Sequence, residues 1–230
     1  MNRDIGDILK SWDFNPNSII VRKIISDDNK EKLQIRVNLG ILQMEVDGRP
    51  DGKTPNGEES LLDYYGSLIN KQEMLEGTAN NFTLTEQDMN ELDIEVMQYY
   101  HRRICFFALN DYVHARMDAE HSLRLMNLIK NYCKDRNYVD SHEQYRPFVI
   151  MERTRAAGLE SLNNHDYAKA MEYISDAMVM IQDFYSEHGV DEEDIERRHE
   201  LTLLRKWREK IHQDWEGGVI DIDEDDFGIQ

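Results

Sequence analysis

The stretch SLNNHDYAKAMEYISDAM, Ser161–Met178, decides how this chain is expected to fold. A short polar break precedes a run in which apolar and small side chains recur with helical spacing. An earlier stretch, ALNDYVHARMDAEHSL at Ala108–Leu123, has the same form. Because each stretch follows one helical segment and begins another, the repeated unit is predicted to be a helical hairpin.

The two copies agree at an aromatic residue and at small residues. Tyr112 and Tyr167 begin the second helix of each hairpin, where the ring is expected to close the mouth of the hairpin. Small residues follow three and ten positions later, and they let neighbouring helices approach closely. These small residues are Ala115 and Ser122 in the first copy, and Ala170 and Ala177 in the second.

This pattern resembles the tetratricopeptide repeat. Gly158, nine residues before Tyr167, stands where that family places the small residue of the first helix, whereas Arg103 stands there in the first copy. The copies are about 55 residues apart, and tetratricopeptide repeats recur about every 34, so an irregular helical layer is expected. The resemblance implies that first helices line a groove for a partner. The partner-binding candidates are Tyr100, Glu152, Arg155 and Asn163.

The segments that begin at Tyr112 and Tyr167 also look like the UVR motif, the helical hairpin through which the excision-repair proteins UvrB and UvrC associate. The Arg-Asp pair of that motif is replaced here by Ala119-Glu120 and Ile174-Ser175. The stretch GILQMEVDGRPDG, Gly40–Gly52, resembles an uncharacterised family of bacterial proteins labelled as containing a UvrB/UvrC motif. This resemblance implies an alternative function, an accessory factor that docks onto excision-repair proteins.

A small antiparallel β element is predicted near the N-terminus. A short helix is expected over residues 4–12, and residues 18–26 read as a strand rich in branched side chains. Residues 33–39 alternate apolar and polar, and the phase reverses after Gly40. The reversal predicts either a β-bulge or a tight turn that starts a new strand.

The segment DGRPDG, residues 47–52, is predicted to form consecutive turns. Asp47 and Asp51 could act as cation ligands, but two carboxylates fall short of the six to eight oxygens that Ca²⁺ prefers. Gly, Pro and Asp favour turns for reasons of backbone geometry, and this explains the composition of the segment without a metal.

From residue 58 onward only helices are predicted, so the fold class is mainly α with irregular tetratricopeptide-like hairpins. Thr85 and Asp88 are spaced as a helix N-cap and its third-position acid, and Pro147 fits the first turn of a helix. The expected organisation is an N-terminal helix and β element over 1–57, a helical domain over 58–216, and a disordered acidic tail over 217–230.

Composition and charge favour a protein partner. The formal net charge is -19, which repels nucleic-acid phosphate, so direct nucleic-acid binding is not expected. The sequence contains no apolar run long enough to cross a membrane, so no membrane span is predicted. The two cysteines, Cys105 and Cys133, lie in predicted helices and suggest buried thiols in a reducing cytoplasm.

No motif predicts an enzyme. Signatures of a nucleophile elbow, a phosphate-binding loop and a dinucleotide-binding loop are absent from the sequence, so no catalytic residue, cofactor or metal ligand is assigned. Asp118-x-x-His121 and Glu196-x-x-His199 pair a carboxylate with an imidazole as di-iron bundles do, which leaves a metal-binding helical-bundle enzyme as the less favoured alternative. The preferred hypothesis is a non-enzymatic adaptor or scaffold that presents a helical surface to a protein partner.

Overall fold

The computed structural model describes residues 4–79 and 81–217. Packing contacts divide the chain into two compact units. The first unit holds the residues up to Asp111 together with residues 127–134, and the second holds residues 112–126 and those from 135 onward. Helix α4 (Tyr112–Tyr132) therefore contributes to both units. The boundary expected between residues 57 and 58 falls inside the first unit.

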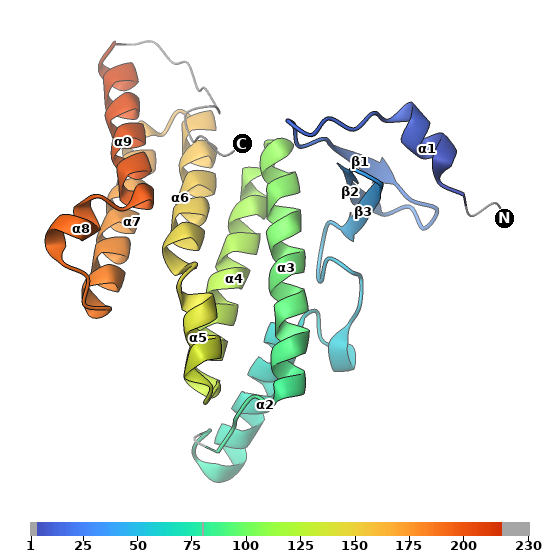
Figure 1. Ribbon diagram of the computed structural model, residues 1–230, viewed down its shortest axis with the longest axis horizontal. Coiled ribbons are helices and arrows are strands. Elements are labelled where there is room, and N and C mark those ends of the chain that lie inside the picture. The colour runs from blue at the N-terminus through green and yellow to red at the C-terminus, as the bar shows by residue number, and fades with distance from the viewer. Residues whose placement is uncertain (1–3, 80, 218–230) are drawn as a thin grey trace. The chain divides into compact units, whose positions relative to one another are not determined.

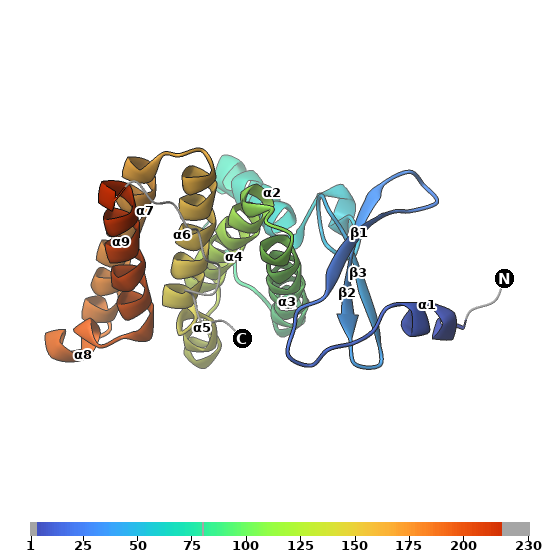
Figure 2. The ribbon, with the colours of Figure 1, turned by 90° about the horizontal axis from the view of Figure 1, so that it is seen from above.

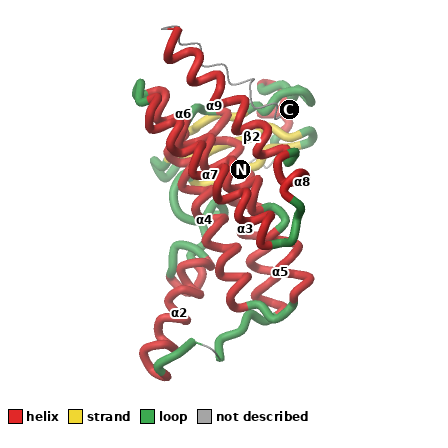
Figure 3. Tube along the Cα trace, turned by 90° about the vertical axis from the view of Figure 1, so that its left-hand side faces the viewer, coloured by secondary structure: helices red, strands yellow, loops and turns green. Residues whose placement is uncertain are grey.

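The predicted fold class is confirmed, because the chain is mainly helical with a small antiparallel sheet near the N-terminus. In the described part of the chain the strands lie between Val21 and Glu45, and the rest is helix and loop (Figure 3). Hydrophobic periodicity alone was sufficient to separate these two regions.

The first unit begins with α1 (Gly6–Ser11) and a sheet of three antiparallel strands in the order β1-β2-β3 (Figure 1). These strands are β1 (Val21–Ile25), β2 (Glu31–Val37) and β3 (Gly40–Glu45). Val37 pairs with Gly40 and Leu33 with Met44, so only Asn38 and Leu39 lie between β2 and β3. Cross-strand partners share a face, which places odd-numbered residues of β2 with even-numbered residues of β3. The phase reversal after Gly40 is therefore caused by a tight turn that starts a new strand, which is one of the two predicted alternatives.

The two faces of this sheet have different partners. Leu33 is buried where β2 contacts α3, and Lys23 on the same face is 3.1 Å from the Asp111 carboxylate. On the opposite face the guanidinium carbon of Arg22 lies 4.0 Å from the centre of the Trp12 ring. Arg36 Nε also donates to the Trp12 carbonyl at 2.8 Å. The segment after α1 therefore covers this face through cation–π contact and hydrogen bonding.

Helices complete the first unit. After a 3₁₀ turn at Pro55–Gly57 come α2 (Leu61–Glu76) and α3 (Glu86–Ala108), which the end of α4 joins. The capping box predicted for α3 is confirmed: Thr85 Oγ1 accepts the Asp88 N–H at 3.2 Å, and Asp88 Oδ2 accepts the Thr85 N–H at 2.7 Å.

The second unit contains the beginning of α4 and five further helices among the described residues (Figures 1 and 2). These are α5 (Arg136–Glu143), α6 (Arg146–Asn163), α7 (Tyr167–Glu187), α8 (Glu192–Glu196) and α9 (His199–Gly217). Helices α6, α7 and α9 pack along one another around a buried apolar core. Pro147 stands in the first turn of α6, as predicted. Apart from Gly217, the acidic tail predicted from the sequence lies outside the described residues.

No helix in residues 4–79 and 81–217 combines the length and the apolar character that crossing a membrane requires. Neither Cys105 nor Cys133 is in a disulfide; Cys105 is buried, and half-buried Cys133 donates from Sγ to Met89 Sδ at 3.3 Å.

Candidate functional site

The DGRPDG turns are held against α3 by a network around Arg49. This side chain is 8% exposed, and its Nε lies 3.2 Å from Asp51 Oδ1 and 3.6 Å from Glu95 Oε2. Arg49 Nε also donates to Gln98 Oε1 at 3.3 Å, and Gln98 Nε2 donates to Asp51 Oδ2 at 3.1 Å. Arg49 and Asp51 are therefore engaged with one another and with α3.

Two further side chains of α3 hold the backbone of the same turns. Arg102 Nη1 donates to the carbonyl of Gly48 at 2.7 Å and to that of Glu45 at 3.2 Å. The Tyr99 hydroxyl donates to the Gly48 carbonyl at 3.3 Å, and the Arg102 guanidinium carbon lies 4.8 Å from the centre of the Tyr99 ring. These contacts hold the backbone of the turns against α3, and they favour an architectural role for the segment.

Glu95 connects this network to the start of α2. Its side chain is fully buried, and its carboxylate accepts the backbone N–H groups of Leu61 at 2.8 Å and Leu62 at 3.3 Å. The first N–H groups of a helix lack partners inside the helix, and the helix dipole favours a negative charge beside them. One carboxylate thus fixes α2, α3 and the turns relative to each other.

Hydrogen bonds lower the pKa of the Asp51 and Asp88 carboxyl groups. Burial by itself raises the pKa of Asp51, but the Lys53 N–H, the Gln98 amide and the Arg49 charge outweigh it and lower that pKa below its usual value. Burial likewise opposes the lowering of the Asp88 pKa by hydrogen bonds from Thr85 and Tyr65. In turn, burial and then the bond to Asp88 raise the pKa of the Tyr65 phenol.

The small residues of the predicted repeat are all buried. Ala115, Ala170 and Ala177 have no exposed surface. A Cβ added to Gly158 would lie 2.3 Å from Cη2 of Trp207, so the glycine makes room for a ring on α9. The close approach expected inside the hairpin therefore extends to a third helix.

The tyrosines that begin the second helices differ in their surroundings. Tyr112 is buried, whereas Tyr167 is half-buried and its ring stacks on that of Trp215, with centroids 6.2 Å apart and planes inclined by 18°. Tyr167 therefore contacts Trp215 at the end of α9. The alignment of the two copies does not predict this contact.

The predicted partner-binding residues lie in both units. Glu152 and Arg155 come together on α6, with Oε1 and Nη1 3.8 Å apart, and their side chains are only 5% and 12% exposed. Burial leaves little of either side chain for a partner to touch. Asn163 is exposed at the end of α6, and Tyr100 is half-buried on α3. Their role in binding stays a prediction.

The two carboxylate–histidine pairs lie in unlike surroundings. Asp118 is buried, whereas Glu196 is exposed, forms an ion pair with Arg205 and accepts Gln182 Nε2 at 2.9 Å. Within the described residues, no three His, Cys, Asp or Glu side chains are grouped so that they could hold a metal ion.

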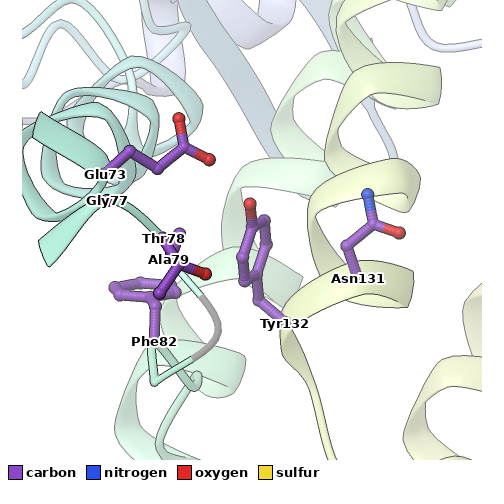
Figure 4. Close-up of a pocket in the computed structure, with 7 residues that line it drawn as sticks. All are labelled: Glu73, Gly77, Thr78, Ala79, Phe82, Asn131 and Tyr132. Carbon is purple, nitrogen blue, oxygen red and sulfur yellow. The ribbon is translucent and has the colours of Figure 1, made fainter.

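A pocket of about 500 Å³ lies inside the first unit, between the end of α2, the loop after it and the end of α4 (Figure 4). The residues that line it are Glu73, Gly77, Thr78, Ala79, Phe82, Asn131 and Tyr132. The carboxylate of Glu73 and the hydroxyl of Tyr132 extend into the space between the two helices (Figure 4).

Aromatic rings and one backbone hydrogen bond hold the walls of this pocket. The Phe82 and Tyr132 rings meet edge to face with centroids 5.3 Å apart. The centroid of the Tyr65 ring lies 6.2 Å from that of Phe82. The Leu84 N–H donates to the Tyr132 carbonyl at 2.9 Å and ties the loop to the end of α4. The pocket is therefore bordered by aromatic side chains that are themselves packed.

Two large apolar side chains stand exposed on the helix that contributes Glu73. Met74 is 88% exposed and Leu75 is 76% exposed. The buried positions of α2 are Leu61, Leu62, Tyr65 and Ile69. Met74 is out of phase with that stripe, and Leu75 continues its edge beyond the last buried position; an apolar residue out of phase was the signal in the sequence that could have located the site.

Known proteins add no assignment for this site. Comparisons of the chain with protein-family models, curated proteins and solved structures each find no match. The resemblances to tetratricopeptide and UVR hairpins therefore stay predictions, and the function is argued from the geometry.

Proposed function

We propose that the protein is a non-enzymatic adaptor that binds a protein partner at the end of α2. The observation that carries this proposal is the exposure of Met74 and Leu75 in the last turn of α2, the helix whose end also lines a pocket with aromatic walls. Exposed apolar side chains next to a concave, largely preformed site are typical of binding surfaces. Methionine in particular is common at surfaces that adapt to a partner.

The packing around the pocket supports this function. Ser60 and Glu95 cap the start of α2, and the Leu84 to Tyr132 hydrogen bond fixes the loop after its end. A surface that is already ordered loses less conformational entropy when it binds. A partner would therefore gain contacts without first organising the pocket.

The helical hairpin supplies a second surface within the same proposal. Asn163 is exposed at the end of α6, and the packing of α6 against α7 and α9 supports that helix. Of the predicted contacts, Asn163 and Tyr100 have accessible side chains. They are expected to contribute less than Met74 and Leu75, because binding energy concentrates in a few well-packed apolar anchors.

Charge and thiol chemistry indicate the setting. A net charge of -19 favours a protein over a nucleic-acid partner. Two cysteines that form no disulfide are compatible with the reducing cytoplasm that we propose as the compartment.

Photocrosslinking in the native cell tests the proposal. A benzophenone amino acid is placed at Leu75, at Asn163 or, as the control, at Lys53, whose side chain is 77% exposed in the same unit as Leu75. We expect one discrete crosslinked product from position 75 that Met74→Asp removes. The same products from positions 75 and 53, or none from position 75, would contradict the α2 surface. A product from position 163 alone would move the binding surface to α6.

A further inference from the structure

We infer that the pocket at the end of α2 accepts the ammonium group of a lysine side chain from a basic segment of the partner protein. This inference rests on the proposed function and names the chemistry that the partner offers. Three features of the pocket carry it: the charge of its walls, the ends of the helices that meet there, and its size.

The walls of the pocket suit a cation. Phe82 and Tyr132 supply aromatic rings, which attract an ammonium group through their electron-rich faces. Glu73 supplies a carboxylate, and the Tyr132 hydroxyl adds a neutral oxygen acceptor. None of the seven lining residues is Lys, Arg or His. An anionic ligand would meet the Glu73 carboxylate with no compensating positive charge.

Two helix C-termini adjoin the pocket. Glu73 and Gly77 belong to the end of α2, and Asn131 and Tyr132 belong to the end of α4. Unsatisfied carbonyl groups give the C-terminal end of a helix a partial negative charge, which favours a cation within the last turn. The last turn of α2 contains no basic residue, so its dipole has no positive side chain of its own. In the last turn of α4, Lys130 is exposed and does not line the pocket.

The dimensions fit a side chain with its neighbouring backbone. A volume of about 500 Å³ is far larger than an ammonium group needs and lies within the range of ligand pockets. By helix geometry Met74 lies about 60° around α2 from Gly77, which places it at the rim. There it can contact the aliphatic stem of a lysine. The methylene groups of lysine pack on apolar surface while its ammonium group extends into the pocket.

A second carboxylate strengthens the negative field at the mouth. Glu76 lies about 60° around α2 from Glu73 on the other side, and Gln72 and Asn81 donate to its Oε2 at 3.2 Å and 3.3 Å. With a net charge of -19, the whole chain also attracts a basic segment from a distance.

Peptide titration of the full-length ¹⁵N-labelled protein tests the inference. The probe is the peptide acetyl-Gly-Ser-Leu-Lys-Leu-Ser-Gly-amide, and its counterpart with Nε-acetyl-lysine keeps the length of the side chain and removes its charge. We expect the lysine peptide to shift the amide signals of Gly77, Thr78, Ala79 and Asn131, and the acetylated peptide to bind about tenfold more weakly.

Variants separate the pocket from general attraction to an acidic protein. Glu73→Gln is expected to weaken the lysine peptide about fivefold, and Phe82→Leu about threefold, because each removes one cation-binding group. Glu59→Gln changes the charge equally at the other end of α2, where Glu59 is exposed, and should leave the affinity unchanged. Equal binding of both peptides, equal effects of Glu73→Gln and Glu59→Gln, or no shifts at these amides at millimolar peptide would overturn the inference.

The same variant distinguishes this inference from the proposed function. If Glu73→Gln leaves the crosslink from position 75 intact in the cell, the partner binds at α2 without a lysine in the pocket and the inference fails alone. If the peptide binds as expected and position 75 gives no crosslink, the pocket chemistry holds and the proposed function fails.

Discussion

Gly158 on α6 faces the indole ring of Trp207 on α9 so closely that an added Cβ would lie 2.3 Å from Cη2 and 2.9 Å from Cζ3. Both residues are buried. Because residue 158 has no side chain, α6 and α9 can approach each other this closely in the second unit.

We predict that Gly158→Ala destabilises the second unit by about 1–3 kcal/mol, because a buried methyl group must displace a ring in a packed core. Urea denaturation followed by Trp fluorescence measures the change. Gly66→Ala is the matched control: Gly66 lies within α2 with open space around the added Cβ, and the change should stabilise by about 0.5–1 kcal/mol.

The steric origin of the first effect can be separated from helix propensity. Trp207→Phe removes the distal ring atoms that the new methyl group would meet, so Gly158→Ala should cost less in that background. Equal costs in both backgrounds would rule out the indole ring as the cause.

Glu95→Gln is predicted to destabilise the first unit by about 3 kcal/mol, because it removes the negative charge beside buried Arg49 and weakens the cap on α2. Hydrogen exchange at Leu61 and Leu62 should accelerate with it. Glu91→Gln, at an exposed position one turn earlier on α3, should change stability by less than about 0.5 kcal/mol. Similar losses from both variants would contradict the role assigned to Glu95.

The stability of the first unit should depend on Asp51 in acid. Its folded pKa is lowered, so its contribution is fully present above the unfolded pKa of about 3.9 and disappears as pH falls through the folded pKa. We expect the wild type to exceed Asp51→Asn in urea midpoint at neutral pH, and the difference to shrink below about pH 4. A difference that does not change with pH would mean that the Asp51 charge has no part in holding the turns.

Trp215→Ala should destabilise α9 by about 0.5–1.5 kcal/mol, because it removes the ring that stacks on Tyr167. Trp215→Phe keeps a ring and should cost less. Gln213→Ala, on an exposed position of the same helix, is the control and should have little effect. Thermal unfolding followed by circular dichroism gives all three values, and a loss of equal size for Trp215→Phe and Trp215→Ala would exclude stacking as the source.

Local signals predicted much of this fold. The spacing of Thr85 and Asp88 predicts where α3 begins. The alternation on either side of Gly40 predicts either a β-bulge or a tight turn between β2 and β3. The pairing of Val37 with Gly40 shows that it is the turn. These features depend on residues that are neighbours in the chain, where periodicity and capping chemistry act.

Contacts between distant residues could not be predicted in the same way. The residues around Arg49 predict turns, and nothing nearby in the sequence indicates that Glu95 completes the network of Arg49. The pocket likewise depends on Phe82 meeting Tyr132, a contact set by tertiary packing. The repeat pattern predicts groove residues on α6, but it contains no information on which of them become buried, as Glu152 does.

Helix α4 gives the chain an order of assembly. Residues 127–134 belong to the first unit, yet the ribosome makes them after residues 112–126, which belong to the second. The sheet, α2 and α3 are therefore synthesised without their last packing partner, and the first unit can close only after the second has begun to emerge. A nascent chain halted at Asp111 would expose to chaperones the surface that the end of α4 later covers.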